Sequence, residues 1–76
     1  MIYNRIALLR TEQDITRQQL AEQVDVNYQT IGFIERGDYF PSLELAFKIA
    51  NVFGVNIDIV FSDKPFKPLF SQKGEA

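Results

Sequence analysis

Residues 28–36, YQTIGFIER, carry side chains that could hydrogen-bond to the edges of DNA bases, at a spacing that places them on one face of a helix. A helix advances by about 100° per residue, so the apolar Ile31 and Ile34 point to one side and other positions point away from it. The residues on the outward side are Gln29, Gly32, Phe33 and Arg36, with Tyr28 at its edge. Glutamine can form two hydrogen bonds with adenine, and arginine can reach a guanine or a phosphate. The alternative is an ordinary solvated helix face, because many soluble helices have the same periodicity.

The segment that must position this helix, residues 15–37, predicts two short helices joined by a tight turn. Thr16 can cap the first helix, and Gln19 stands three places later, as in a capping box. Asn27 can cap the second helix, and Gly37 stands where a helix commonly ends in the left-handed conformation. Since only about three residues separate the two helices, they must cross at a steep angle. A short helix held out by its neighbour in this way can enter the major groove of DNA.

The composition restricts the classes of protein and of site that this chain can represent. Its 76 residues are enough for one domain, and 46% of them are hydrophobic, which suits a helical core. It has no cysteine and no histidine, so we expect no disulfide, no metal site, no cofactor and no enzyme. No apolar run of about 18 residues and no signal peptide is present, so we expect no membrane contact and a cytoplasmic location. The net charge of −2 counts against nucleic-acid binding, unless the basic groups gather on one side.

Several runs of residues together resemble the helix-turn-helix regulators of the Cro and phage-repressor type, the XRE family. These runs are LAEQV at 20–24, QTI at 29–31, IERG at 34–37 and PSLELAFKIA at 41–50. The resemblance covers roughly residues 2–61, and it implies an all-α, five-helix lambda-repressor-like domain over residues 1–70, with its helix-turn-helix at 16–36. In that family the start of the second helix and the outer face of the third contact DNA. Carried onto this chain, the DNA-binding positions are Arg17, Gln18, Asn27, Tyr28, Gln29, Thr30, Phe33 and Arg36.

Two positions depart from the family pattern, and one pair matches it. Asp25 replaces the usual glycine of the turn, which places an acidic group near the DNA side. Phe33 stands where a lysine or another polar residue is common; its ring could select thymine by contact with the methyl group, or it could pack on the protein surface or against a partner. Arg10 and Glu35 match a charged pair typical of the family, which would tie the first helix to the third. The alternative is that Arg10 is simply a surface residue.

Two further helices are predicted, one on either side of this segment. The first covers residues 4–12 and turns Ile6 and Leu9 inward. The second begins after Ser42, a good N-cap residue, and ends at Gly54. Its polar residues form a single stripe, which consists of Glu44, Lys48 and Asn51. Because nearly all its other positions are apolar, we expect this helix to be almost enclosed.

The end of the chain combines a short helix with an apolar tail. Asn56 is the N-cap candidate of a fifth helix that reaches Phe61. The tail from Lys64 contains prolines that exclude a helix, so we expect it to be extended and to pair with residues 1–4 as a small antiparallel strand pair. The alternative is a disordered tail, and residues 71–76 are expected to be disordered in either case. Apolar residues here exceed what one short helix can bury, which predicts a dimer interface of Ile57, Ile59, Val60, Phe61 and Phe66.

Three classes of function follow from these observations. We expect a sequence-specific DNA-binding transcriptional regulator, a repressor that binds a palindromic site in double-stranded DNA as a homodimer. Such a protein would be bacterial or encoded by a phage or plasmid, and no small-molecule ligand is evident. The alternative is an antitoxin-like or co-regulatory module that binds another protein, with DNA binding secondary. An enzyme is the weakest interpretation, because no pair of carboxylates and no glycine-rich loop stands at a catalytic spacing.

Overall fold

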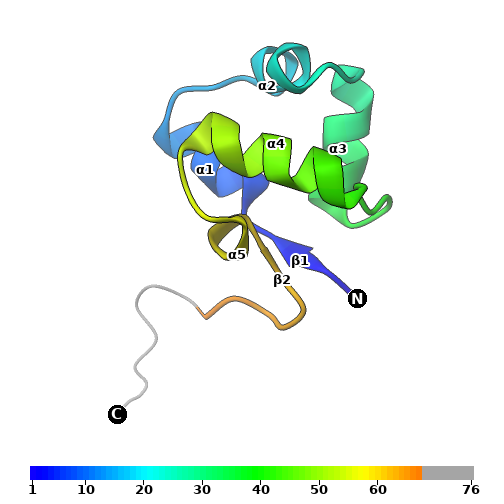
Figure 1. Cartoon of the computed structure of the whole chain (residues 1–76), viewed down its shortest axis with the longest axis vertical. Helices are drawn as coiled ribbons and strands as arrows, with labels where there is room; N and C mark the ends of the chain where they lie inside the picture. Colours follow the sequence, from blue (N-terminus) through cyan, green and yellow to red (C-terminus); the bar gives the residue numbers. More distant parts are fainter. Residues whose placement is uncertain (68–76) are drawn as a thin grey trace.

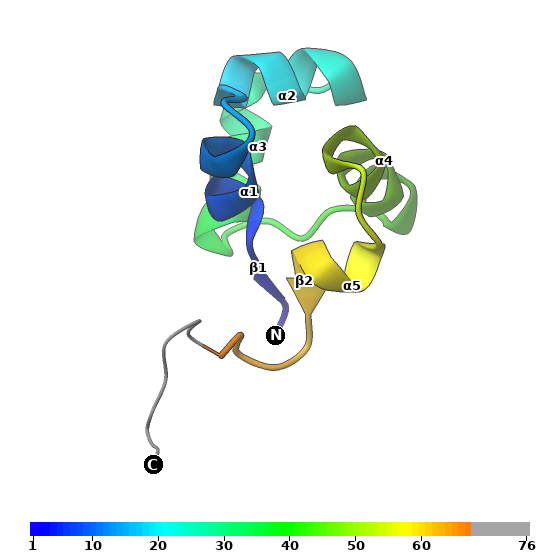
Figure 2. The same cartoon turned by 90° about the vertical axis from the view of Figure 1, so that its left-hand side faces the viewer.

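Five short helices and one pair of strands make up the part of the chain that the structure, a computed structural model, describes, which is residues 1–67 (Figure 1). In chain order the elements are β1 (Tyr3–Asn4), α1 (Ile6–Glu12), α2 (Arg17–Val24), α3 (Tyr28–Arg36), α4 (Leu43–Phe53), α5 (Ile57–Val60) and β2 (Phe61–Ser62). The expected five-helix architecture with a small antiparallel strand pair is therefore confirmed. The strand pair and α5 lie at the end of the molecule away from α2 in both views (Figures 1 and 2).

Local capping chemistry sets the ends of the two helices of the central motif. The Thr16 hydroxyl accepts from the Gln19 backbone N–H, and the Gln19 side chain accepts from the Thr16 N–H, which completes the capping box at the start of α2. Asn27 caps α3 by accepting from the Gln29 N–H at 2.9 Å. Asp25 ends α2 in the left-handed region, with φ 62°, and this reverses the chain between the two helices. The result is the steep crossing of α2 and α3 that Figure 1 shows.

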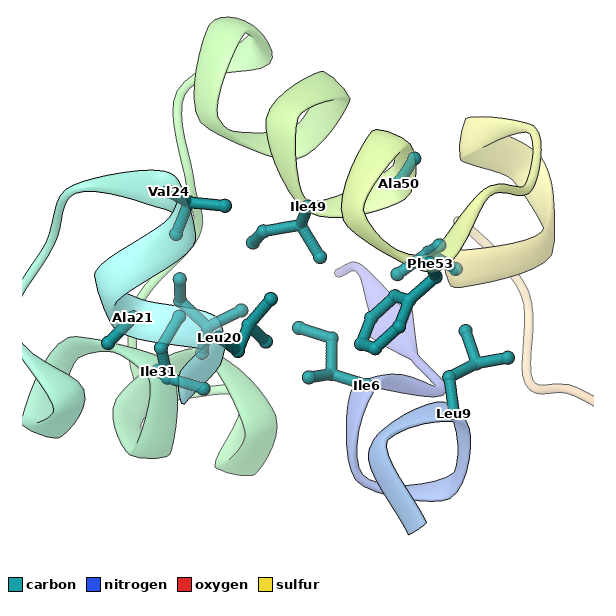
Figure 3. Close-up of a cluster of buried hydrophobic side chains, with 11 residues drawn as sticks. Ile6, Leu9, Leu20, Ala21, Val24, Ile31, Ile49, Ala50 and Phe53 are labelled. Carbon is teal, nitrogen blue, oxygen red and sulfur yellow. The ribbon is translucent and has the colours of Figure 1, made fainter. Parts of the chain in front are cut away.

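The core lies where the inward faces of all five helices meet (Figure 3). Its completely buried residues include Ile6 from α1, Leu20 from α2, Ile31 from α3 and Ile49 from α4. No polar or charged residue is classed as buried among residues 1–67. The driving force is therefore burial of apolar surface, at roughly 25 cal/mol per Å². This core fixes α3 with its other face turned outward.

The strand pair forms at a different place from the one predicted. β1 pairs with β2 in antiparallel register, Tyr3 opposite Ser62 and Asn4 opposite Phe61, so the partner of the N-terminus is not the tail around Phe66. Pro65 explains the difference, because proline has no N–H for a ladder. Predicted pairing beyond residue 67, and the expected disorder of residues 71–76, lie outside the described residues. Two helix boundaries also move: α1 begins at Ile6 rather than at residue 4, and Phe61 belongs to β2 rather than to α5.

Helix α4 is much less enclosed than its sequence predicts. It packs into the core through one side, which consists of Ala46, Ile49, Ala50 and Phe53. Leu43 remains 70% exposed and Phe47 48% exposed. The prediction of an almost enclosed helix was wrong because no element within residues 1–67 covers the side that carries these two residues. This leaves an apolar surface on α4.

Candidate nucleic-acid interface

The outward face of α3 presents the side chains that the sequence singled out. Gln29 is exposed, Tyr28 and Phe33 are about half exposed, and Thr30 is partly buried. The Gln29 amide forms no hydrogen bond within residues 1–67, so its donor and acceptor remain free for a base edge. An unpaired glutamine on a rigid, capped helix is well suited to read DNA, because the backbone that carries it is already ordered before it binds.

Asn27 and Gln18 have different roles at this face: Asn27 caps α3, whereas Gln18 is exposed in α2. The Asn27 Oδ1 accepts the cap hydrogen bond from the Gln29 N–H, so this oxygen holds the start of α3. Gln18 lies in the first turn of α2 and is exposed. The backbone N–H groups at the start of α2 and α3 give both helix ends a partial positive charge that favours phosphate.

Glu35 joins α1, α2 and α3 through two arginines. Arg10 Nε donates to Glu35 Oε2 at 2.6 Å, and Arg10 Nη2 donates to Oε1 at 3.4 Å. The side chains of this pair are only 16% and 6% exposed. Arg17, from the first turn of α2, contacts the same carboxylate with its Nη2 at 3.1 Å from Oε1. The sequence predicted the pair with Arg10 but not the contact that holds Arg17 beside α3.

Asn4 positions α3 in a way that the sequence analysis missed. Its Nδ2 donates to the Ile34 carbonyl at 2.9 Å, and its Oδ1 accepts from the Ile6 N–H at 3.1 Å. The Ile34 carbonyl belongs to the last turn of α3 and also accepts from the Gly37 N–H at 3.0 Å, so Asn4 adds a second donor to it. One side chain therefore fixes the start of α1 to the end of α3. An asparagine two residues before an apolar helical run was the available signal, since this residue type favours helix caps.

Arg36 lies at the other end of the exposed face. Its Nε contacts Asp38 Oδ2 at 3.3 Å, and its Cζ lies 5.1 Å from the centre of the Phe33 ring. Both charged side chains are more than half exposed, so the ion pair with Asp38 is weak and can give way to a stronger anion. The structure thus brings Arg17 and Arg36 to the same side of the molecule as Gln29 and Phe33, against a net charge of −2 for the whole chain.

The predicted dimer residues do not form one exposed patch. Val60 is completely buried in the core, so its assignment to an interface was wrong; α5 is a single turn and turns this residue inward. Ile59 is exposed, whereas Ile57 and Phe61 are partly buried. Phe66 lies against the Arg5 guanidinium, with 4.0 Å between the Arg5 Cζ and the ring centre.

A different apolar surface lies where Ile2, just before β1, meets α4, α5 and β2. It is a shallow groove whose lining carries no charged residue. Its lining residues are Ile2, Phe40, Pro41, Leu43, Ala46, Ile57 and Phe61. We call it the β1–α4 groove. No cluster of acidic residues that could hold a metal ion occurs among residues 1–67, and no helix there is long and apolar enough to cross a membrane.

Comparisons with known proteins match this chain to helix-turn-helix proteins. Residues 6–60 match the family model described as helix-turn-helix. An uncharacterized HTH-type transcriptional regulator from Methanocaldococcus jannaschii is 47% identical over 76% of this chain and 88% of its own length. A second, from Bacillus subtilis, is 41% identical over 76% of this chain and 88% of its own length. The solved structure of a candidate DNA-binding protein from Bacteroides fragilis is 29% identical and superposes with a TM-score of 0.74, covering 82% of this chain and all of that one.

Proposed function

The chain belongs to the Cro/C1-type, or XRE, family of helix-turn-helix transcriptional regulators, and from that premise we propose that it is a repressor that binds a palindromic operator as a homodimer. Family membership makes it a transcriptional regulator with a lambda-repressor-like DNA-binding domain. The mode of regulation, the symmetry of the site and the dimer are our proposals. Relatives come from archaea and bacteria alike, so the family does not point to one kind of host.

The observation that carries the proposal is the free, rigidly mounted face of α3. Capping by Asn27, the bond from Asn4 and the core contacts of Ile31 hold the helix, while the Gln29 amide stays unpaired. In the proposed complex α3 lies in the major groove and Gln29 pairs with the edge of one base, most simply an adenine. Arg17, Gln18 and Arg36 contact the backbone, which sets the register.

Phe33 is proposed to select thymine. Its ring is 46% exposed on the same side as Gln29, and the Arg36 guanidinium lies over one face of it. An apolar ring gains little from water and fits the C5-methyl group of thymine. Tyr28 and Thr30, at the first turn of α3, are proposed to contact the adjoining base edges or phosphates.

A homodimer is proposed because one protomer offers few basic groups to DNA. Affinity depends steeply on the number of neutralised phosphates, and a two-fold pair doubles that number. It also presents two copies of α3 about 34 Å apart, one turn of DNA. We place the contact at the β1–α4 groove, since exposed apolar surface of this kind marks interfaces.

The same groove supports a second candidate function, a co-regulator that uses it to bind a different protein. In that case the protein would be antitoxin-like, with DNA binding secondary, and the net charge of −2 would be less surprising. The two candidates differ in what fills the groove. A partner protein would leave the purified chain monomeric, whereas the homodimer forms from the chain alone.

DNase footprinting of the purified protein on DNA around its own gene tests the proposal. We expect a protected region with two-fold symmetry, lost in a Gln29→Ala variant and kept in a Lys48→Ala variant, because Lys48 lies on the exposed stripe of α4. Sedimentation of the same sample should show a dimer at micromolar concentration. Protection of a single half-site by a monomer, or no protection at any concentration, would contradict the proposal.

A further inference from the structure

Gly32 is buried, although its position on α3 faces outward with Gln29 and Phe33. The cover comes from two arginines of different helices. A β-carbon built on Gly32 would lie 3.4 Å from Arg36 Nη1 and 3.7 Å from both Arg17 Nη1 and Arg17 Cδ. The two guanidinium groups therefore converge over one glycine in the middle of the proposed DNA-binding face.

Each arginine is anchored through atoms other than its Nη1. Arg17 contacts Glu35 Oε1 with Nε at 3.2 Å and with Nη2 at 3.1 Å. Arg36 contacts Asp38 with Nε at 3.3 Å, and its guanidinium stacks on Phe33. Within residues 1–67 neither Nη1 donates a hydrogen bond, so two charged donors remain free beside the same point. Like charges are brought together here, and an anion between them would relieve the repulsion.

We propose that Arg17 and Arg36 form one binding site for a single backbone phosphate of the bound duplex, and that Gly32 leaves the space for this phosphate. The two non-bridging oxygens of a phosphodiester can accept one charge-assisted hydrogen bond from each Nη1. Glu35 and Asp38 then act as positioning residues that aim the two side chains at this point. The inference rests on the proposed DNA binding and goes further, since it assigns both arginines to one phosphate.

Gly32 matters because the proposed phosphate-binding site lies directly above its α-carbon. Any side chain would place carbon where the phosphate oxygens approach, and even a methyl group would fill the space between the two Nη1 groups. Backbone strain is not the reason for glycine here, since the positive φ angles among the glycines occur at Gly37 and Gly54. Alanine at position 32 should therefore favour the helix and disfavour the phosphate.

The decisive experiment replaces single phosphates of a bound duplex by neutral methylphosphonates, one linkage at a time. For the wild-type protein we expect one linkage in each half-site whose neutralisation weakens binding about tenfold. In Arg17→Gln and in Arg36→Gln that same linkage should lose its effect, while Lys48→Gln should keep the wild-type pattern. If the two arginine variants lose sensitivity at different linkages, each arginine holds its own phosphate and the proposal is wrong.

Gly32→Ala gives a second test whose two readouts move in opposite directions. The thermal midpoint should rise, because glycine is unfavourable inside a helix. Operator affinity should fall, and the negative slope of log K against log salt should become shallower by about one per protomer. Asn51→Ala, an exposed helical position of α4, is the control that should favour the helix without weakening DNA binding. Unchanged DNA affinity and salt slope in a stably folded Gly32→Ala would overturn the role of Gly32.

Two further outcomes separate this inference from the function on which it rests. Inorganic phosphate at millimolar concentration should shift the Gly32 amide resonance of the free protein, because it offers the same oxygens. A shift without any effect in the methylphosphonate scan would make this a site for free anions and would contradict the proposal. If the protein binds DNA sequence-specifically but the two arginine variants share no sensitive linkage, only the proposed phosphate-binding site is refuted. If the protein binds no duplex, the proposed function and the phosphate-binding site are both refuted.

Discussion

Replacing Arg10 by methionine should destabilise the fold more than any comparable change of an exposed charge. The substitution keeps an unbranched apolar stem but removes the guanidinium from Glu35, a carboxylate that is 6% exposed. It also removes the hydrogen bond from Arg10 Nη1 to the Ile15 carbonyl, which measures 3.2 Å. The folded state then retains a nearly buried charge with one partner fewer.

The size of this effect follows from the contacts that remain. Loss of one partner from a buried ion pair costs about 3–5 kcal/mol when the other charge is left alone. Here Arg17 stays 3.1 Å from Glu35 Oε1, and it is 44% exposed, so it compensates in part. We therefore expect a loss of about 2–3 kcal/mol. A chain of this length has a total unfolding free energy of roughly 4–11 kcal/mol, so the variant should be folded but fragile.

Urea unfolding followed by circular dichroism measures this loss directly. Lys48→Met is the matched control, since the Lys48–Glu44 pair is exposed and should cost at most about 0.5 kcal/mol. The double variant with Arg10→Met and Glu35→Leu should regain more than half of the loss, because no buried charge is left uncompensated. If Arg10→Met and Lys48→Met unfold within about 0.5 kcal/mol of each other, Glu35 is well solvated and this reasoning is wrong.

Three further predictions concern the DNA and dimer surfaces. Gln29→Ala should lose about 1–3 kcal/mol of discrimination at one base pair with non-specific binding nearly unchanged, and equal losses on operator and random DNA in binding titrations would remove Gln29 from base readout. Replacing the contacted thymine by deoxyuridine should weaken wild-type binding by about 0.8 kcal/mol, the value of one buried methyl-sized group. The same replacement should not change the affinity of the Phe33→Ala variant, and equal losses for both proteins would exclude the methyl contact. Leu43→Lys should convert the dimer to a monomer in sedimentation velocity. Leu8→Lys, at an exposed position of α1 outside the β1–α4 groove, should leave the dimer intact. A dimer that persists in Leu43→Lys places the interface elsewhere.

Local signals made the central motif predictable from sequence. The cap at Thr16 involves residues three apart, and the left-handed turn at Asp25 involves the chain within a few residues, so neither depends on the rest of the fold. The inward spacing of Ile31 and Ile34 likewise follows from helical periodicity alone. These features fix how α2 and α3 cross, and hence which face of α3 is exposed.

Features that depend on distant elements were missed or misplaced. The burial of Gly32 requires two long side chains from the start of α2 and the end of α3, and periodicity counts it only as an outward position. The exposure of Leu43 depends on which elements happen to cover α4, which its own pattern does not reveal. The register of β1 follows from where α5 ends: the Val60 carbonyl accepts from the Arg5 N–H at 2.8 Å, and β2 begins at the next residue.

Selection from a random duplex library, followed by affinity measurement, tests whether the exposed face of α3 reads a DNA sequence. We expect an enriched sequence made of two symmetric half-sites whose centres lie about one helical turn apart. This sequence should be bound at least about 10³-fold more tightly than random DNA at physiological salt, and Gln29→Ala should reduce this ratio. Enrichment of no sequence, with weak binding that is the same for all duplexes and disappears as salt is raised, would mean that α3 does not read DNA.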